Sequence, residues 1–365
     1  MKIGIFLGAG ASAAESLPIQ NELFSKYFKD ITKEDCKSDM NRELYKFFKQ
    51  MFNIDILKDN TDVVNFPTFE EVLGLLDLAE QRRESFKNFG LETLNNRSDS
   101  IRYLRQYLIL LMAQAINNTT ENTNKYHSLL VKNLLDANVL LDTTFISANY
   151  DINIDNTIAS LYSEKNHPIM LDYGVDFTNF NIKNGWKRPK DPLIKLYKIH
   201  GSLNWLYCPI CNSLNLTPYE GGVMRLLKNT EETRCLECQE ITVPIIIPPT
   251  YFKNMANVFL STVWNETEKA LRETDILVFC GYSFPEADIH IKYMLKRIQT
   301  SRKKPPLKIM VFNNHSKKYK SSLKKEEFRY KRFLGEDVIF TKNSFQDFAT
   351  DPMKFINDVT KKFDK

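Results

Sequence analysis

The segment Lys2–Glu15, KIGIFLGAGASAAE, decides the fold prediction, because in it a short apolar run ends in two glycines and a serine. An apolar run of this length is typical of a strand that is buried on both faces. A strand that continues through Gly8, Ala9 and Gly10 into a helix presents backbone N–H groups that can hold a pyrophosphate, although a tight turn accounts for the same glycines. The hydroxyl of Ser12 can either donate to a phosphate or cap the helix.

Further runs rich in β-branched and aromatic residues are distributed along the chain. They span residues 141–151, 193–201, 242–250, 275–283, 307–314 and 336–345. Each is short enough to be one buried strand. Because helical patterns and long insertions separate these runs, the sequence predicts an α/β fold with a doubly wound parallel sheet.

Small and polar residues gather where several of these strands would end. They are Asn149 and Asp151 in the run 141–151, His200 in the run 193–201, and Gly281, Ser283 and Asn313 in two later runs. Ligands of open α/β sheets bind outside the carboxyl ends of the strands, so we expect these residues to line one crevice. Each also has a structural interpretation, since Asn and Asp stabilise turns and a lone histidine is often only hydrogen-bonded.

Two insertions are predicted to interrupt the sheet. Residues 21–138 have mainly helical periodicity, as in "SIRYLRQYLILLMAQAI", and predict a helical subdomain inserted after the first strand. Residues 204–243 form the second insertion. The expected core therefore consists of residues 1–20, 139–203 and 244–365, of which the last range includes the C-terminal region.

Four of the six cysteines form two Cys-x-x-Cys pairs, Cys208 with Cys211 and Cys235 with Cys238. In a chain without an evident secretion signal, this pattern favours a metal over disulfides. Two pairs of thiolates can close a tetrahedral shell around zinc with no open position, which is typical of a structural metal. The alternative is a labile or empty site.

Charge and hydropathy exclude some classes of function. The formal net charge is +5, and no apolar stretch is long enough to span a membrane, so a cytoplasmic protein is expected. The charges are scattered, so nucleic acid is expected to be involved only indirectly, if at all. The exception is the basic run 315–332, which is either a contact surface for phosphate or an acidic partner, or a solvated helix face.

In combination and in this order, these motifs resemble the sirtuins. The resemblance rests on Gly8-Ala9-Gly10-Ala11-Ser12-Ala13, Asn149-Tyr150-Asp151, His200-Gly201, the two cysteine pairs, Gly281-Tyr282-Ser283 and Asn313. It covers about half of the chain. It implies a Rossmann-type doubly wound parallel sheet, NAD as co-substrate and a small zinc ribbon, beside the large inserted helical subdomain.

The chain also departs from the sirtuins that deacylate proteins. After the glycine segment it continues as "ESLPIQNELF", without the Asp-Phe-Arg element of those enzymes, and Ala148 stands where glutamine usually precedes the asparagine. With its large helical insertion, the chain looks more like the bacterial sirtuin-like NADases of anti-phage defence. That resemblance implies hydrolysis of NAD to nicotinamide and ADP-ribose.

The resemblance implies a role for each site residue. Asn149 would position the ribose and the attacking water, and His200 would act as general base or orient the ribose hydroxyls. Asp151 would bind the nicotinamide carboxamide. The pyrophosphate would lie on Gly8, Ala9, Gly10 and Ser12, and the adenosine half on Gly281, Ser283 and Asn313.

Related stand-alone NADases work beside HerA-type ATPases or other defence proteins. The resemblance therefore implies a homo-oligomer and such a partner, with residues 317–332 as a candidate contact surface. Two other functions stay open at this point: an NAD-dependent protein deacylase, and a non-catalytic sensor of NAD or ADP-ribose within a defence complex.

Overall fold

The computed structural model describes most of the chain and divides it into two units. The described residues are 1–59, 61, 64–90, 100–117, 125–163, 171–178, 193–217, 234–246, 257–313 and 320–363. The sheet unit consists of Met1–Ser16, Asn122–Ile246 and Met255–Lys365. The helical unit consists of Leu17–Glu121 and Ile247–Asn254.

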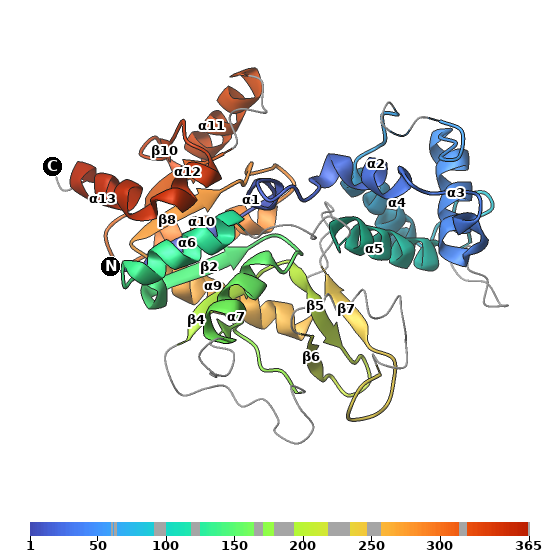
Figure 1. Cartoon of the computed structure of the whole chain (residues 1–365), viewed down its shortest axis with the longest axis horizontal. Helices are drawn as coiled ribbons and strands as arrows, with labels where there is room; N and C mark the ends of the chain where they lie inside the picture. The colour runs from blue at the N-terminus through green and yellow to red at the C-terminus, as the bar shows by residue number, and fades with distance from the viewer. Residues whose placement is uncertain are drawn as a thin grey trace. The chain divides into compact units, whose positions relative to one another are not determined.

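A seven-stranded parallel sheet forms the centre of the sheet unit, in the order β10-β9-β8-β1-β2-β4-β3 (Figure 1). Its strands are β1 (Ile3–Leu7), β2 (Thr143–Ser147), β3 (Leu171–Asp172), β4 (Ile194–Lys198), β8 (Ile276–Cys280), β9 (Lys308–Phe312) and β10 (Ile339–Phe340). Every residue of β1, β2 and β8 is buried, as expected for strands covered on both faces. The predicted doubly wound parallel sheet is confirmed.

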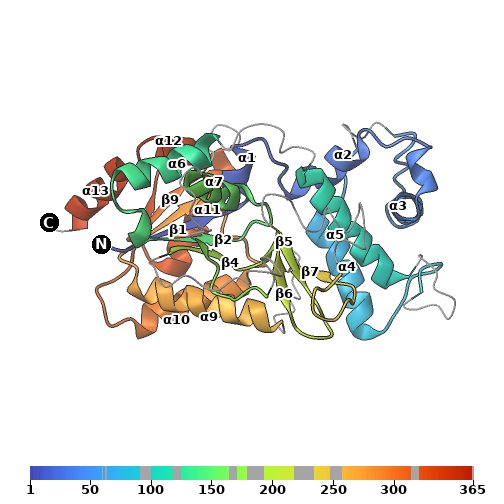
Figure 2. The same cartoon turned by 60° about the horizontal axis from the view of Figure 1, so that its bottom comes forward.

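Helices cover both faces of this sheet. In Figure 2, α9 and α10 lie on one face, and α6, α7 and α12 lie on the other. The helices of this unit are α1 (Ala9–Ala13), α6 (Lys125–Asp136), α7 (Asn153–Ser163), α9 (Val258–Glu273), α10 (Ile289–Ser301), α11 (Lys320–Leu334), α12 (Phe345–Thr350) and α13 (Pro352–Phe363). The apolar stripe of α6 includes Leu130 and Leu134, which are fully buried.

A second, three-stranded antiparallel sheet carries the cysteine pairs. Its strands are β5 (Gly201–Tyr207), β6 (Leu214–Leu216) and β7 (Val243–Ile246), in the order β6-β5-β7. The run 242–250, expected in the parallel core, is therefore an antiparallel partner of β5 over its described part. A short apolar run shows that a strand exists but does not show which sheet it joins.

The helical unit contains α2 (Leu23–Phe28), α3 (Asp39–Phe52), α4 (Phe69–Arg82) and α5 (Ile101–Asn117). A cluster of aromatic rings forms part of its core. The ring of Phe24 lies 4.8 Å from that of Phe48 and 5.6 Å from that of Phe69. Thr68 and Glu71 form a capping box at the start of α4, which explains why this helix begins at Phe69.

The helix α6 falls outside this unit, although the sequence analysis included it in the helical subdomain 21–138. It packs against α7 and α12 in the sheet unit. Periodicity identifies a helix and its apolar face, but both units offer apolar surface to such a face, so the sequence does not say which one receives it.

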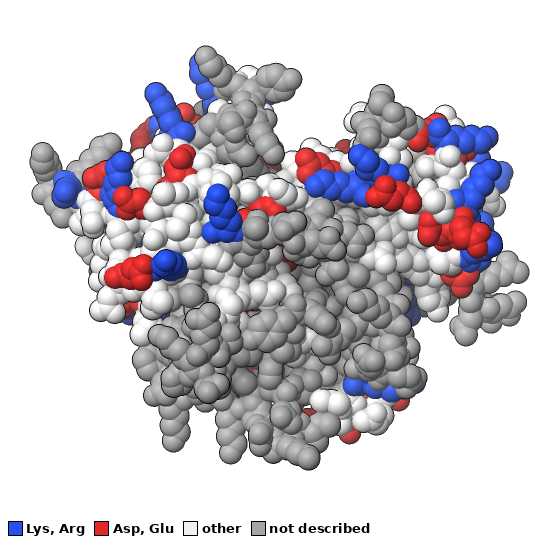
Figure 3. All heavy atoms as spheres, viewed as in Figure 1, with Lys and Arg blue, Asp and Glu red and all other residues white. Residues whose placement is uncertain are grey.

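The surface drawn in Figure 3 carries Lys and Arg residues interspersed with Asp and Glu residues. Of the basic run 315–332, residues 315–319 lie outside the described residues. The part within α11 has six basic residues and two acidic ones, Glu326 and Glu327, and Lys331 pairs with Glu327 at 2.7 Å. Among the described helices, none combines the length and the apolar character that a membrane span requires.

Candidate functional site

The side chains of Asn149, Ser12 and Asp151 form a chain of hydrogen bonds beyond the adjoining strands β1 and β2. The Asn149 amide donates to the backbone oxygen of Gly8 at 2.9 Å and to Ser12 Oγ at 2.8 Å. The Ser12 hydroxyl in turn donates to Asp151 Oδ2 at 2.6 Å. All three side chains belong to buried residues. The structure therefore brings together three residues that the sequence analysis selected from two separate strand ends.

This chain of hydrogen bonds fixes the orientation of the Asn149 amide. Both hydrogens of its amide are used on Gly8 and Ser12, so the amide oxygen is the remaining functional atom. Within the described part of the chain, this oxygen accepts no hydrogen bond. It is able to accept one from a water molecule or from a sugar hydroxyl.

The three predicted glycines at these strand ends pack against one another. Gly8 N–H donates to Cys280 O at 2.9 Å, and Gly10 N–H donates to Gly281 O at 2.8 Å. A Cβ on Gly8 would lie 2.7 Å from the backbone of Tyr282, and one on Gly10 would lie 2.8 Å from that of Gly281.

This packing changes the interpretation of Gly8 and Gly10. The sequence analysis assigned their N–H groups to a pyrophosphate, whereas the structure uses them on the carbonyls of Cys280, at the end of β8, and Gly281, in the β8–α10 connection. The glycines are needed because two backbone segments approach each other closely. A phosphate at this strand end would have to use other donors. Ala9, the first residue of α1, is exposed there.

His200 lies just beyond β4, on the neighbour of β2 in the sheet. Its Nδ1 lies 3.2 Å from Ala148 O, the residue before Asn149. A carbonyl can only accept, so this contact places the proton on Nδ1 and leaves Nε2 as the basic nitrogen of the neutral ring. Trp264 of α9 supports the strand end by donating to Ile199 O at 2.7 Å.

Gly201, which follows His200, is required by the backbone. It has a φ of +82°, and a Cβ there would lie 2.0 Å from Ile245 O in β7. The chain turns at this point from the parallel sheet into β5 of the small sheet. The His-Gly pair thus combines a site side chain with the turn that joins the two sheets.

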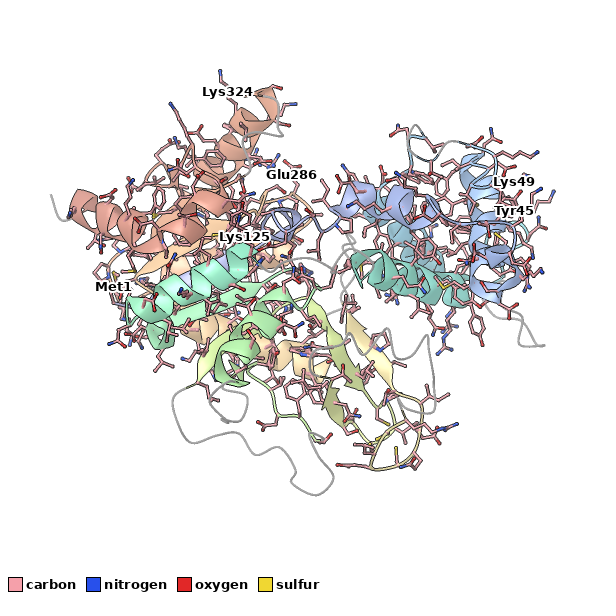
Figure 4. All side chains as sticks on the ribbon, viewed as in Figure 1. Met1, Tyr45, Lys49, Lys125, Glu286 and Lys324 are labelled. Carbon is pink, nitrogen blue, oxygen red and sulfur yellow. The ribbon has the colours of Figure 1, made fainter. Side chains whose placement is uncertain are left out.

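A buried carboxylate anchors the segment that carries Ser12. Glu15 accepts hydrogen bonds from the backbone N–H groups of Lys125, Tyr126 and His127, at 3.1, 2.6 and 3.0 Å, and lies 3.1 Å from the His127 ring. These are the first N–H groups of α6, and Figure 4 labels Lys125 at that helix end. A negative charge is favourable at a helix N-terminus. The sequence analysis gave no role to Glu15 or His127.

The predicted adenosine-binding residues lie at the ends of β8 and β9. The amide of Asn313 donates to Glu326 at 2.8 Å and to Tyr282 O at 3.4 Å, and Asn313 is 1% exposed. The backbone oxygen of Ser283 accepts from Arg329 at 2.8 Å. Asn313 is thus enclosed by α11 and by the Gly281–Ser283 connection, while Ser283 is half-buried.

The four paired cysteines converge beside the small sheet, in the turn between β5 and β6 and in the segment before β7. Their sulfur atoms all lie within 4.8 Å of one another, and Cys208–Cys238 and Cys211–Cys235 are separated by 3.4 Å. Sulfurs bound to a tetrahedral zinc lie about 3.8 Å apart, because each Zn–S bond is about 2.3 Å. The donor set and its spacing fit a zinc ion.

The environment of Cys235 favours the thiolate that a metal needs. Burial raises the pKa of this thiol, but hydrogen bonds from Ser213 and from the N–H groups of Cys238 and Glu237 outweigh that effect and lower the pKa to about 6. Cys208 N–H donates to Ser213 O at 2.9 Å and Cys235 N–H donates to Glu240 O at 2.8 Å, so each pair lies on a tight turn. A four-cysteine cluster of this kind could bind zinc with all its positions filled.

Comparisons with known proteins place the chain in a family. A model of the SIR2-like domain matches residues 143–333, which is more than half of the chain. A search of curated proteins gives no match. The protein therefore belongs to the SIR2-like domain family, and this membership implies NAD-dependent activity in general terms.

Solved structures similar to this chain include two Sir2 complexes. One holds a p53 peptide and NAD+, with a TM-score of 0.45, 11% identity and coverage of 98% of this chain and 94% of that chain. The other is a Sir2 crystal structure with the inhibitor EX-527, 2'-O-acetyl-ADP-ribose and a deacetylated p53 peptide. It has a TM-score of 0.41, 13% identity and the same coverage.

Proposed function

We propose that this protein is an NAD glycohydrolase that cleaves NAD to nicotinamide and ADP-ribose. The observation that carries this proposal is the chain of hydrogen bonds from Asn149 through Ser12 to Asp151, next to His200, in a SIR2-like family member. These four residues lie just beyond the carboxyl ends of the neighbouring strands β1, β2 and β4, where open α/β sheets bind their ligands.

In the proposed reaction, the bond between nicotinamide and ribose breaks through an oxocarbenium-like state. Its electron pair leaves with the nicotinamide, which becomes neutral, and a water molecule attacks the ribose carbon. The Asn149 amide oxygen accepts a hydrogen bond from that water or from a ribose hydroxyl. Because Ser12 and Gly8 hold the amide, this oxygen is oriented before the substrate arrives.

His200 takes the proton of the attacking water in this proposal. The Nδ1–H contact with Ala148 O holds the neutral ring with Nε2 as its basic atom, which is the state a general base requires. The same contact ties the ring to the residue next to Asn149. His200, the proposed base, and Asn149, the proposed water-positioning group, are thus linked through the backbone of Ala148.

Asp151 is proposed to bind the nicotinamide carboxamide, and the rest of the NAD molecule is proposed to extend toward β8 and β9. Asp151 is already held on one oxygen by Ser12 and on the other by the Asn153 N–H at 3.1 Å. Ala9 N–H and the hydroxyl of Ser283 are the donors we propose for the pyrophosphate and the adenosine half. The amide of Asn313 supports that end of the site from within the fold.

We further propose that NAD depletion serves bacterial anti-phage defence in the cytoplasm. This subtype is supported by the departures from deacylating sirtuins described above, namely "ESLPIQNELF" after the glycine segment and Ala148 before the asparagine. An enzyme that depletes NAD has to stay silent until it is triggered. We propose that self-association or a defence partner, such as a HerA-type ATPase, supplies the trigger.

Product analysis tests the proposed reaction. The purified full chain is incubated with NAD over a range of protein concentrations, with and without an acetylated peptide, and the products are identified by chromatography and mass spectrometry. The proposal predicts nicotinamide and ADP-ribose without peptide. Products that form only with peptide and include acetyl-ADP-ribose would make the protein a deacylase, the alternative that the cysteine cluster and the Asn, Asp and His set also support.

A non-catalytic sensor of NAD or ADP-ribose is the second alternative. It is distinguished by Asn149→Ala and His200→Ala in cells challenged with phage. An enzyme loses protection in both variants even where NAD still binds. A sensor keeps protection as long as its affinity for the ligand survives.

A further inference from the structure

Lys198 is a buried cation that the reaction described above does not use. It is the last residue of β4, two positions before His200, and it is 0% exposed. Its ammonium donates to the backbone oxygen of Asp151 and lies 3.3 Å from Asp155 Oδ2. One end of β4 thus supplies both the proposed general base and a bond to the loop that carries Asn149 and Asp151.

A buried polar network surrounds the partner of Lys198. Asp155, in the first turn of α7, accepts from the Tyr173 hydroxyl at 2.7 Å and from the Asn204 amide at 3.4 Å. Burial, followed by the charge of Asp155, raises the pKa of Tyr173 well above its usual value, so this hydroxyl keeps its proton and donates. The carboxylate is therefore fixed from β4, β5 and the segment after β3.

The energetics of buried ion pairs indicate that stability alone does not explain this arrangement. Removing an ammonium and a carboxylate from water costs about as much as their attraction returns, and apolar residues of similar size are often at least as stable. The pair does provide a donor fixed in position. That donor holds the backbone carbonyl of Asp151, and the carboxylate of the same residue accepts a hydrogen bond from the Ser12 hydroxyl.

The loop is also held by two contacts that do not depend on Lys198. Leu203 N–H donates to Tyr150 O at 3.0 Å, and the Asn149 amide donates to Gly8 O. Of the three successive residues 149–151, each is thus fixed to a different element. The bond to the Asp151 peptide from the β4 side is made by Lys198.

We propose that Lys198, oriented by Asp155, is a positioning residue that sets the Asn149–Asp151 loop for NAD cleavage. The inference rests on the proposed function of that loop. Lys198 touches neither substrate nor reacting atoms, and acts through the carbonyl of Asp151. A small displacement of such a loop is expected to reduce turnover on the order of 100-fold while the substrate still binds.

The test uses a charge-neutral pair, because Lys198→Met alone would leave Asp155 buried without its cation and could prevent folding. The double variant Lys198→Met with Asp155→Asn removes both charges and keeps one side-chain oxygen, which can accept from Tyr173 and Asn204 as Asp155 Oδ1 does. The matched control is Lys195→Met, an exposed lysine on the same strand. The readouts are kcat and KM for NAD, and hydrogen–deuterium exchange of peptides that cover residues 148–155.

The inference predicts that the double variant folds, that its kcat falls on the order of 100-fold with a KM changed by less than about threefold, and that residues 148–155 exchange faster while β8 does not. Lys195→Met keeps wild-type values. Wild-type kcat and exchange in the double variant would overturn the inference. If the wild-type chain itself cleaves no NAD, the proposed function fails, and exchange of residues 148–155 still decides whether Lys198 sets the loop.

Discussion

At the scale of single residues, Ser12 is the link on which the site geometry depends. It accepts a hydrogen bond from Asn149 and donates one to Asp151, so its hydroxyl couples the proposed water-positioning group to the proposed carboxamide ligand. The sequence analysis placed Ser12 at the site but predicted that its hydroxyl either donates to a phosphate or caps the helix. Neither role is needed to explain a serine here.

Replacement of Ser12 tests this coupling. In Ser12→Ala, a buried amide hydrogen and a buried carboxylate oxygen both lose their partner, so the free energy of unfolding should fall by about 1–3 kcal/mol. Turnover of NAD should fall on the order of 10- to 100-fold, because Asn149 and Asp151 are no longer held together. Steady-state kinetics and urea unfolding measure the two effects. Wild-type kcat in this variant would show that the hydrogen bonds of Ser12 to Asn149 and Asp151 have no part in the reaction.

Replacement of Gly281 tests the close packing of Gly8, Gly10 and Gly281. Its φ is +64°, and a Cβ would lie 2.1 Å from Ala11 N. Gly281→Ala should therefore lower the free energy of unfolding by more than about 3 kcal/mol. Gly74→Ala is the matched control, since Gly74 is within α4 and has open space at its Cβ, and it should raise stability by about 0.5–1 kcal/mol. Equal effects of the two changes would contradict the close approach described here.

At the scale of elements, the parallel sheet and most of its strands were predictable. The strands β1 and β8 are apolar runs, β2 is rich in β-branched and aromatic residues, and small or polar residues follow each of them. The placement of β7 in the small sheet was not predictable from the sequence, because β7 pairs with β5, which is about forty positions away along the chain. Lys198 was also missed. A lysine inside a run expected to be buried was the available signal, because a buried charge requires a partner.

The cysteine cluster yields an element-scale prediction. We expect about one equivalent of zinc per chain, and loss of that zinc together with a lower melting temperature in Cys208→Ser, because metal binding contributes to the folding of such small sheets. Cys36→Ser is the matched control, because Cys36 belongs to the helical unit and the four clustered cysteines belong to the sheet unit. Metal analysis and thermal unfolding check both variants. A purified chain that is metal-free and equally stable in Cys208→Ser would remove zinc from this account.

At the scale of the whole molecule, the protein combines a SIR2-like sheet unit with a helical unit that has its own aromatic core. The sequence revealed the catalytic candidates through their order along the chain, and the structure brings Asn149, Ser12, Asp151 and His200 to neighbouring strand ends. It could not reveal that Gly8 and Gly10 use their N–H groups within the protein. Such use depends on the β8–α10 connection, which is distant in sequence.

The most direct test of the central claim is the rate of nicotinamide release from NAD, without peptide, by the wild-type chain, by Asn149→Ala and by Asn156→Ala. Asn156 is a half-buried residue of the same type in α7, with no hydrogen bond from its side chain among those the structure describes. We predict release by the wild type and by Asn156→Ala, and a rate lower by on the order of 100-fold in Asn149→Ala. Equal rates in all three proteins, or no release by the wild type, would contradict the assignment of NAD cleavage to this site.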